Sequence, residues 1–160
     1  LVANRLADPN KVVIRGGSAG GYAVLNGLVH SKVFAAGANY YGVAELIMLA
    51  EDTHDFESRY LDSLIGPYPE QKALYIARSP LTHADNLTSP LIIFQGSDDP
   101  IVPPSQSQAF RDACIKNGVK YKYFEFDGES HGFRKSQTIT TCAIEELKFF
   151  GEVLGFVPAD

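Results

Sequence analysis

The fold of this chain is decided by residues 12–22, which read VVIRGGSAGGY. The β-branched run predicts a strand over residues 11–15. Because the middle of that strand is continuously apolar, we expect both of its faces to be buried, as in a parallel sheet. The glycines after Arg15 predict a tight turn, and residues 22–30 predict a helix. A strand that passes through a turn directly into a helix is typical of an α/β domain.

The rest of the chain continues this alternation. Further strands are predicted at residues 34–41, 90–94 and 121–126, and helices at residues 105–117 and 139–154. Between residues 43 and 88 we expect several short helical pieces instead of one helix, because Gly66, Pro67 and Pro69 interrupt them. The pattern predicts four parallel strands flanked by helices and joined by right-handed crossovers.

The two later helices carry more detailed expectations. Ser105 is the predicted N-cap of the first, whose residues Phe110 and Cys114 are expected to face the core. The second has apolar residues at helical spacing, which predicts that this stripe packs against the sheet. The stripe consists of Ile139, Ala143, Leu147, Phe150 and Leu154.

Length and composition describe an ordinary globular protein. The chain has 160 residues, of which 45% are hydrophobic and 21% charged, so a single domain is expected and a collagen-like repeat or coiled coil is excluded. The net charge is −5 and no basic run occurs, which argues against nucleic acid and anionic membranes as partners. No apolar stretch reaches the roughly 18 residues that a membrane helix needs.

The chain contains two cysteines, Cys114 and Cys142, in no recognisable pattern. We expect them to be free thiols buried on helices, which favours a reducing compartment and hence the cytoplasm. No cluster of histidine, cysteine or carboxylate residues has the spacing of metal ligands, so neither a metal nor another cofactor is expected.

Residues 16–20 form the pattern G-x-S-x-G between a predicted strand and a predicted helix. In such a nucleophile elbow Ser18 adopts a strained backbone conformation, and we expect side chains at positions 16 and 20 to collide with the neighbouring turn. The elbow lifts the Ser18 hydroxyl out of the sheet and directs the Ala19 amide toward an oxyanion that develops on a substrate. The pattern therefore predicts a serine nucleophile.

A glycine-rich turn of this kind has other interpretations. The spacing of Gly16 and Gly21 fits a phosphate-binding loop, but Tyr22 occupies the place of its lysine. A dinucleotide fingerprint also fails, because Ser18 stands where its second glycine is needed. A Gly/Ser turn without function fits the pattern equally well, so residues further along the chain must decide.

A serine nucleophile needs a base and a carboxylate that orients the base. Two segments that follow predicted strands supply candidates, QGSDDPIVP at residues 95–103 and DGESHGF at residues 127–133. Only His131 among the histidines follows a strand within a loop flanked by glycine. The others are expected to be structural or surface residues: His30, His54 and His83. Serine, acid and histidine thus follow one another in the chain order of the α/β-hydrolases, at the carboxyl ends of strands.

Together these segments resemble the C-terminal catalytic domain of the prolyl oligopeptidase family of serine peptidases, particularly its acylaminoacyl-peptidase-like branch. The matching pieces are GGSAGGY at residues 16–22, YYGV at 40–43, SPL at 79–81, QGSDDPIVP at 95–103 and ESHGF at 129–133. The family pattern has histidine where this chain has Gln95, which is not a catalytic position. Its spacing selects Asp99 over Asp98, which is then expected to be a solvated or turn-stabilising neighbour.

The resemblance implies a serine peptidase that cleaves peptide or acyl-peptide bonds through an acyl-enzyme. In this mechanism Ser18 is the nucleophile, His131 is the base and Asp99 orients the base. The Ala19 amide belongs to the oxyanion hole. The alternatives are a carboxylesterase with the same catalytic residues and a non-catalytic interaction module with a hydrolase fold.

A substrate pocket is expected near the serine. Tyr40, Tyr41 and Val43 lie at and just after the end of the second predicted strand and are expected to line an apolar side-chain pocket. The other interpretation of these three residues is that they belong to the ordinary core.

The resemblance also implies that residues 1–160 form a single partial domain, the C-terminal half of an α/β-hydrolase fold. The preceding half-sheet, the family's β-propeller and the second oxyanion donor are expected to be absent from this chain, so the chain by itself is expected to be impaired. The strand at residues 11–15 is central in the family and becomes an apolar edge here. We therefore expect self-association through this strand.

Overall fold

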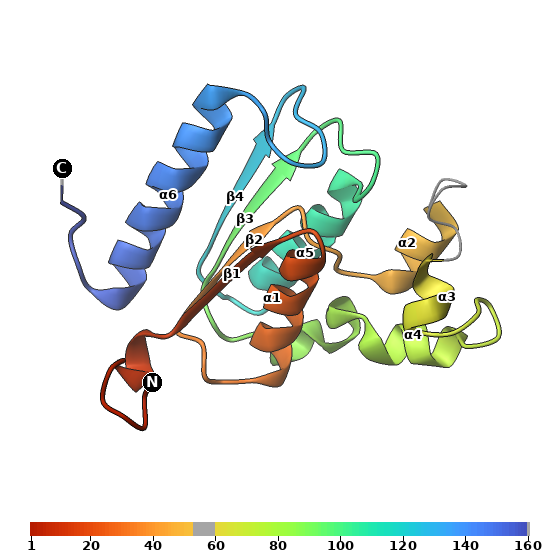
Figure 1. Cartoon of the computed structure of the whole chain (residues 1–160), viewed down its shortest axis with the longest axis horizontal. Coiled ribbons are helices and arrows are strands. Elements are labelled where there is room, and N and C mark those ends of the chain that lie inside the picture. The colour runs from red at the N-terminus through yellow and green to blue at the C-terminus, as the bar shows by residue number, and fades with distance from the viewer. Residues whose placement is uncertain (53–59, 160) are drawn as a thin grey trace.

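In the computed structural model, residues 1–52 and 60–159 are described, and four strands of this part form one sheet in the order β1-β2-β3-β4 (Figure 1). The strands are β1 (Val13–Gly17), β2 (Ala36–Tyr40), β3 (Leu91–Gly96) and β4 (Tyr121–Phe126). Each strand pairs in parallel with the next. β3 has a partner on both sides and is buried throughout, whereas β1 is an edge strand of the described sheet and is about half-buried.

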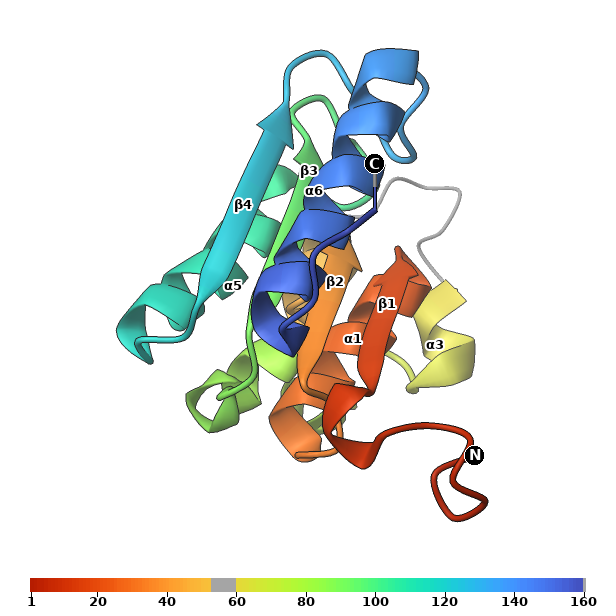
Figure 2. The ribbon, with the colours of Figure 1, turned by 90° about the vertical axis from the view of Figure 1, so that its left-hand side faces the viewer.

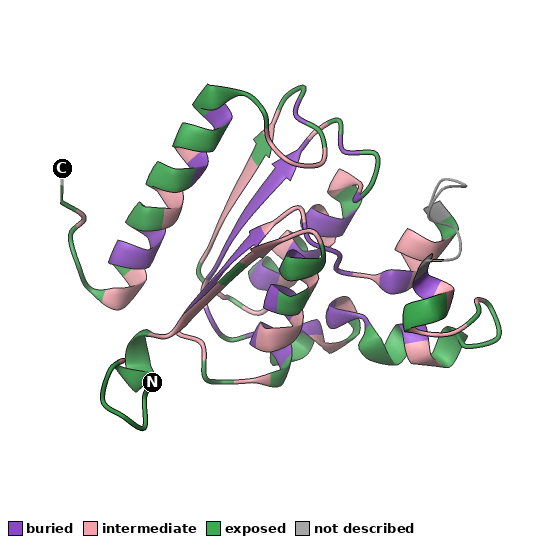
Figure 3. Cartoon of the chain, in the orientation of Figure 1, coloured by how far each residue is buried: buried purple, intermediate pink, exposed green. Residues whose placement is uncertain are grey.

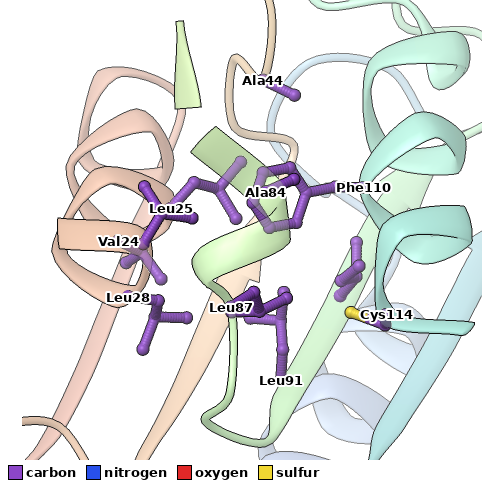
Figure 4. Close-up of a cluster of buried hydrophobic side chains, with 11 residues drawn as sticks. Val24, Leu25, Leu28, Ala44, Ala84, Leu87, Leu91, Phe110 and Cys114 are labelled. Carbon is purple, nitrogen blue, oxygen red and sulfur yellow. The ribbon is translucent and has the colours of Figure 1, made fainter. Parts of the chain in front are cut away.

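Helices cover both faces of the sheet. The helices α1 (Ala19–His30) and α5 (Pro104–Lys116) lie on one face, and α6 (Ser136–Leu154) lies on the other (Figures 1 and 2). The first face has a core in which Leu25 of α1 and Phe110 of α5 pack with residues of β3 (Figure 4). Burial is concentrated on the central strands and on the helix sides that face them (Figure 3). The result is a three-layer α/β arrangement, as predicted.

Short helices connect β2 to β3, also as predicted. They are α2 (Leu46–Asp52), α3 (Tyr60–Leu64), α4 (Lys72–Arg78) and the 3-10 helix η2 (Pro80–Asn86). A third apolar cluster around the buried side chains of Tyr75 and Val102 joins α2, α3 and α4 to the loop after β3. The segment between β2 and β3 that contains these helices, called the insertion below, therefore lies beside the carboxyl ends of the strands. His54 lies outside the described residues.

The bounds of the strands differ from the predicted ones mainly at β1. β4 has the predicted bounds, whereas β1 begins at Val13 because the residues before it form a short 3-10 helix, η1 (Pro9–Lys11). This helix is capped by Asp8, whose Oδ1 accepts the N–H of Asn10 at 2.9 Å. The expected burial of the first strand on both faces is wrong, because Arg15 is exposed and β1 has a single neighbour in the described sheet.

The predicted cap of α5 is wrong. The helix begins at Pro104 with Pro103, not Ser105, as its N-cap. Proline suits the first helical position, because its missing N–H would have no partner there in any case. The expected core residues of α5, Phe110 and Cys114, are fully buried.

The predicted packing stripe of α6 is also wrong in its first half. Ile139 and Leu147 are 51% and 47% exposed, and Cys142 and Phe149 are buried in their place. Ile139 lines a cavity together with Arg15 of β1. The start of the stripe, Ile139 and Ala143, therefore lies beside the β1 edge, where the described sheet has no further strand, whereas Phe150 and Leu154 pack in the core.

The two cysteines are buried free thiols on α5 and α6, as expected. Burial raises the pKa of Cys114 and of Cys142 to about 12, so both thiols are protonated near neutral pH. Nowhere in residues 1–52 and 60–159 does a helix combine the length and the apolar character of a membrane span. The same residues hold no group of three or more side chains suited to a metal ion.

Candidate active site

Ser18 lies on the turn between β1 and α1, at the carboxyl edge of the sheet. Its backbone has a φ of 56° and a ψ of −120°, a conformation that residues other than glycine rarely adopt. Such strain costs on the order of 1–3 kcal/mol, which the packing of the surrounding elements must offset. The Ser18 N–H donates to the Tyr40 carbonyl at 3.0 Å, which ties the turn to β2.

Gly16 is required by the close return of the chain over this turn. A Cβ atom at position 16 would lie 2.5 Å from the carbonyl oxygen of Gly20, a backbone atom that cannot move aside. The collision expected at Gly20 is wrong, because nothing lies within 4 Å of a Cβ atom placed there. Of the two outer glycines of the pattern, only Gly16 is therefore at a position where a side chain would collide with the backbone.

Asp99 lies in the loop after β3 and is buried. Its Oδ1 accepts the backbone N–H groups of Ile101 and Val102, each at 2.9 Å. Asp98 is exposed, and its Oδ1 accepts the Ser97 hydroxyl at 2.7 Å. The structure thus holds Asp99 in a fixed orientation at the end of β3 and leaves Asp98 on the surface of the turn.

His131 lies in the loop after β4, between Asp99 and Ser18. Its Nδ1 is 2.8 Å from Asp99 Oδ2, and its Nε2 is 2.8 Å from Ser18 Oγ. Because an ionised carboxylate only accepts hydrogen bonds, Nδ1 carries the proton, and Nε2 is left to accept the Ser18 O–H. The three side chains therefore form one continuous hydrogen-bonded chain across the carboxyl ends of three strands.

Aromatic rings support the imidazole from the side. The Tyr41 ring lies edge-on to His131 with 4.8 Å between ring centroids, and Phe133 packs against Tyr41 at 5.1 Å. Tyr41 has a φ of 39°, so the backbone is strained at a second residue beside Ser18. Burial, and then the charge of Asp99, raises the pKa of Tyr41, which keeps the phenol neutral.

Glu129 fixes the loop that carries His131, a role that the sequence does not predict. Its carboxylate accepts the backbone N–H groups of Arg134 at 3.0 Å and Lys135 at 2.9 Å. Burial alone would raise the pKa of Glu129, but these N–H groups and the Thr138 hydroxyl lower it. The only signal in the sequence is an acidic residue two positions before the histidine.

Ser18 and His131 open into a cavity of about 590 Å³, a volume typical of ligand sites. The other lining residues are mostly apolar and come from the first turns of α1, from the insertion and from the loops after β2 and β3. They are Ala19, Tyr22, Val43, Leu46, Leu49, Leu61, Leu64, Ile65, Arg78, Ile101 and Val102. The cavity therefore suits a large apolar side chain or acyl group.

Of the three residues expected to line this cavity, the structure places one there. Val43 contributes to it, whereas Tyr40 and Tyr41 line a second cavity of about 360 Å³ with Arg15. The Tyr40 hydroxyl donates to Glu146 Oε2 on α6 at 2.6 Å. Successive residues of a strand point to opposite faces of the sheet, and Tyr40 points to the α6 face.

The leucines of α2 and α3 that line the first cavity were not anticipated. They occur in pairs three residues apart, Leu46 with Leu49 and Leu61 with Leu64. This spacing is common to any helix with one apolar side. Only the folded insertion brings these helices beside Ser18.

The family model described as Prolyl oligopeptidase family, Peptidase_S9, matches residues 1–156 of this chain. The chain belongs to the prolyl oligopeptidase family. Among solved structures it is similar to a puromycin-hydrolyzing peptidase of Mycobacterium tuberculosis, with 46% sequence identity and a TM-score of 0.96. That similarity covers 99% of this chain and 24% of the other.

Relatives of this member of the prolyl oligopeptidase family include peptidases and esterases. The chain is 32% identical over 160 residues to dipeptidyl aminopeptidase BIII of Pseudoxanthomonas mexicana, which covers 96% of this chain and 23% of that protein. It is 28% identical over 172 residues to esterase LipQ of Mycobacterium tuberculosis, covering 96% of this chain and 41% of that protein. It thus spans less than half the length of either relative. With its four parallel strands and flanking helices, the chain has a partial α/β-hydrolase fold.

Proposed function

We propose that this chain carries the active site of a serine peptidase that cleaves peptide or acyl-peptide bonds through an acyl-enzyme on Ser18. The observation that carries the proposal is the hydrogen-bonded chain from Ser18 through His131 to Asp99, with both distances at 2.8 Å. The Asp99 side chain is fully buried and that of His131 is 20% exposed. The base can therefore reach a substrate, while the carboxylate acts on it from a place that water does not screen.

Each residue has a defined task in this reaction. Ser18 Oγ attacks the carbonyl carbon of the substrate while His131 Nε2 takes the hydroxyl proton, and Asp99 stabilises the resulting imidazolium. The amide of Ala19, the first residue of α1, has no partner within the helix and donates to the oxyanion. His131 then gives its proton to the leaving amine. In the second half, water attacks the acyl-enzyme with His131 as the base, which releases the acid and restores Ser18.

The cavity beside Ser18 supports a preference for a large apolar group on the acyl side of the substrate. Val43→Phe narrows this cavity and is expected to raise KM for such a substrate about tenfold, the effect typical of a misfit in an apolar pocket. KM for a matched substrate with a small acyl side chain is expected to stay the same. An equal rise for both substrates would mean that the cavity is not the acyl-side subsite.

A carboxylesterase is the second candidate, and the similarity to esterase LipQ favours it. The same nucleophile, base and carboxylate serve ester cleavage, so their geometry does not separate the two activities. An anilide and an ester with the same apolar acyl group separate them. Cleavage of both supports a peptidase, and cleavage of the ester alone assigns an esterase. Puromycin is a further substrate to include, because a similar solved structure is named a puromycin-hydrolyzing peptidase.

The first test of the site is labelling with a fluorophosphonate, measured as intact mass. We expect a single adduct that is lost in Ser18→Ala and kept in Ser105→Ala, an exposed serine on α5 that serves as the matched control. The absence of an adduct, in protein shown to be folded by circular dichroism, would overturn the proposal. In that case the chain would be a catalytically impaired hydrolase fold.

We also propose that the protein works in the cytoplasm. The free thiols of Cys114 and Cys142 support this compartment, because a reducing environment maintains thiols. Protein isolated from cells and denatured with a thiol reagent present is expected to react at both cysteines. A blocked or disulfide-bonded cysteine in that protein would contradict the assignment.

A further inference from the structure

Gln95 is a fully buried amide at the end of β3, in the loop region of Asp99. Its Nε2 lies 3.4 Å from Asp99 Oδ2 and 3.1 Å from each of the carbonyl oxygens of Gly96 and Val102. Its Oε1 accepts the hydroxyl of Ser107, in the first turn of α5, at 2.7 Å. The amide therefore links the strand, the loop that carries Asp99, and α5.

The contacts of Gln95 determine which end of its amide faces Asp99. The atoms within hydrogen-bond distance of Nε2 are all acceptors, namely a carboxylate oxygen of Asp99 and the carbonyl oxygens of Gly96 and Val102. If the amide were turned over, its oxygen would face three acceptor oxygens, and none of them could donate to it. The donor end of Gln95 must therefore point at Asp99.

Four donors face the carboxylate of Asp99. Oδ1 accepts the N–H groups of Ile101 and Val102, and Oδ2 faces His131 Nδ1 and Gln95 Nε2. In the part of the chain that the structure describes, Gln95 is the only side chain besides His131 that donates to this carboxylate. The two side chains share the same oxygen, so each affects how the other interacts with it.

We propose that Gln95 is a positioning residue for the reaction: its amide holds Asp99 Oδ2 toward His131 and sets the basicity of the imidazole. This role rests on the proposed function. The hydrogen bond from Gln95 partly neutralises the negative charge on Asp99 Oδ2, the oxygen that faces His131. The carboxylate therefore stabilises the imidazolium less than it would without Gln95. The family pattern has histidine at this position, and an amide, unlike histidine, donates unchanged at every pH.

Other groups around the pair do not replace this donor. Among the titratable groups, Tyr41 after β2 packs against His131 and interacts with Asp99. Asp98 and Glu129 are close to the pair in sequence, and Cys142 on α6 interacts with Tyr41. α5 contributes the neutral Ser107. Within the described residues none of these groups donates to Asp99, so the loss of the Gln95 amide is not compensated.

The test is the rate of Ser18 labelling by a fluorophosphonate as a function of pH, in the protein and in Gln95→Leu. The acid limb of this profile reports the protonation of His131. Without this hydrogen bond the Asp99 carboxylate is a stronger acceptor and stabilises the imidazolium of His131 more, so the acid limb is expected to move to higher pH, by up to about one pH unit. At a pH below both limbs, labelling of Gln95→Leu is then expected to be slower than that of the protein itself, by up to about tenfold.

Gln106→Leu is the matched control. Gln106 is also a fully buried glutamine, but its amide binds the backbone of Ala44 and Glu45 instead of Asp99. This variant is expected to lose stability without moving the acid limb. An unmoved limb in Gln95→Leu, or an equal shift in Gln106→Leu, would overturn the role of Gln95.

A second variant keeps the test decisive if Gln95→Leu does not fold. Ser107→Ala leaves the amide in place and removes the hydroxyl that anchors it, so the limb is expected to shift in the same direction by less. An unmoved limb in that variant would then overturn the role. If the unaltered protein is not labelled at all, the proposed function fails together with this role. If it is labelled normally and the acid limb does not move in the variants, only the role of Gln95 is overturned.

Discussion

Replacement of Asp99 by asparagine tests the site most sharply, because the structure dictates how the new amide must lie. Asp99 Oδ1 accepts the N–H groups of Ile101 and Val102 at 2.9 Å, so the oxygen of an asparagine stays at that position. Its NH₂ group then takes the place of Oδ2 and faces His131 Nδ1. Since two donors cannot pair, the imidazole carries its proton on Nε2 instead, and Ser18 loses its acceptor.

The expected effect of Asp99→Asn is a loss of about 10⁴-fold in kcat, the size found for the same replacement in another serine protease. At 1.36 kcal/mol for each factor of ten, this is about 5.4 kcal/mol of transition-state stabilisation. The assay is hydrolysis of an apolar acyl ester under saturating substrate at pH 8. Asp98→Asn is the control and is expected to stay within about twofold of the original, because Asp98 is exposed. A loss below tenfold for Asp99→Asn, or an equal loss for Asp98→Asn, would refute the reasoning.

Three further outcomes are expected. Gly16→Ala should lower Tm and abolish labelling of Ser18, because the new Cβ would lie 2.5 Å from the carbonyl oxygen of Gly20. Gly20→Ala, where a Cβ meets nothing, should retain labelling. An equal loss of labelling in both variants would contradict the steric argument. Glu129→Gln should lower the urea midpoint at pH 7 and much less near pH 3. The pKa of the Glu129 carboxyl is lowered in the folded state, so the carboxylate stabilises the fold at pH values above its ordinary pKa, and this stabilisation is lost as the pH falls through the lowered pKa. An equal decrease of the urea midpoint at both pH values would count against this role. The β1 edge should cause self-association that grows with concentration in sedimentation velocity, and a monomer at every concentration would exclude it.

The residues around Ser18 were predictable because they depend on local sequence and on one rule of topology. A serine between glycines, after an apolar strand and before a helix, has few structures open to it. Asp99 and His131 follow two other strands, and the carboxyl ends of parallel strands meet at one edge of the sheet. The bounds of β4 are predictable because Lys120 and Lys122 alternate with Tyr121 and Tyr123.

The remaining features depend on which parts of the chain meet in space. Leu49 and Leu61 resemble the apolar residues of any short helix until the insertion folds beside Ser18. Gln95 looks like a departure from a motif, and only its contacts with Asp99 and α5 reveal a network. The apolar stripe that begins at Ile139 was assigned to the core, although whether such a stripe is covered depends on the strands beside β1. No local pattern contains this information.

The strands that lead to Ser18 and to Asp99 differ in how firmly they are held. β1 pairs with one strand of the described sheet and is about half-buried, whereas β3 pairs with two and is buried throughout. Local opening begins in elements with few buried contacts, at free energies well below that of global unfolding. Under mild denaturation we therefore expect β1, and Ser18 with it, to detach while β3, the strand before Asp99, still protects its own amide hydrogens from exchange. Labelling of Ser18 would then report the attachment of this one edge strand, and it is expected to be lost at a lower denaturant concentration than the rest of the fold.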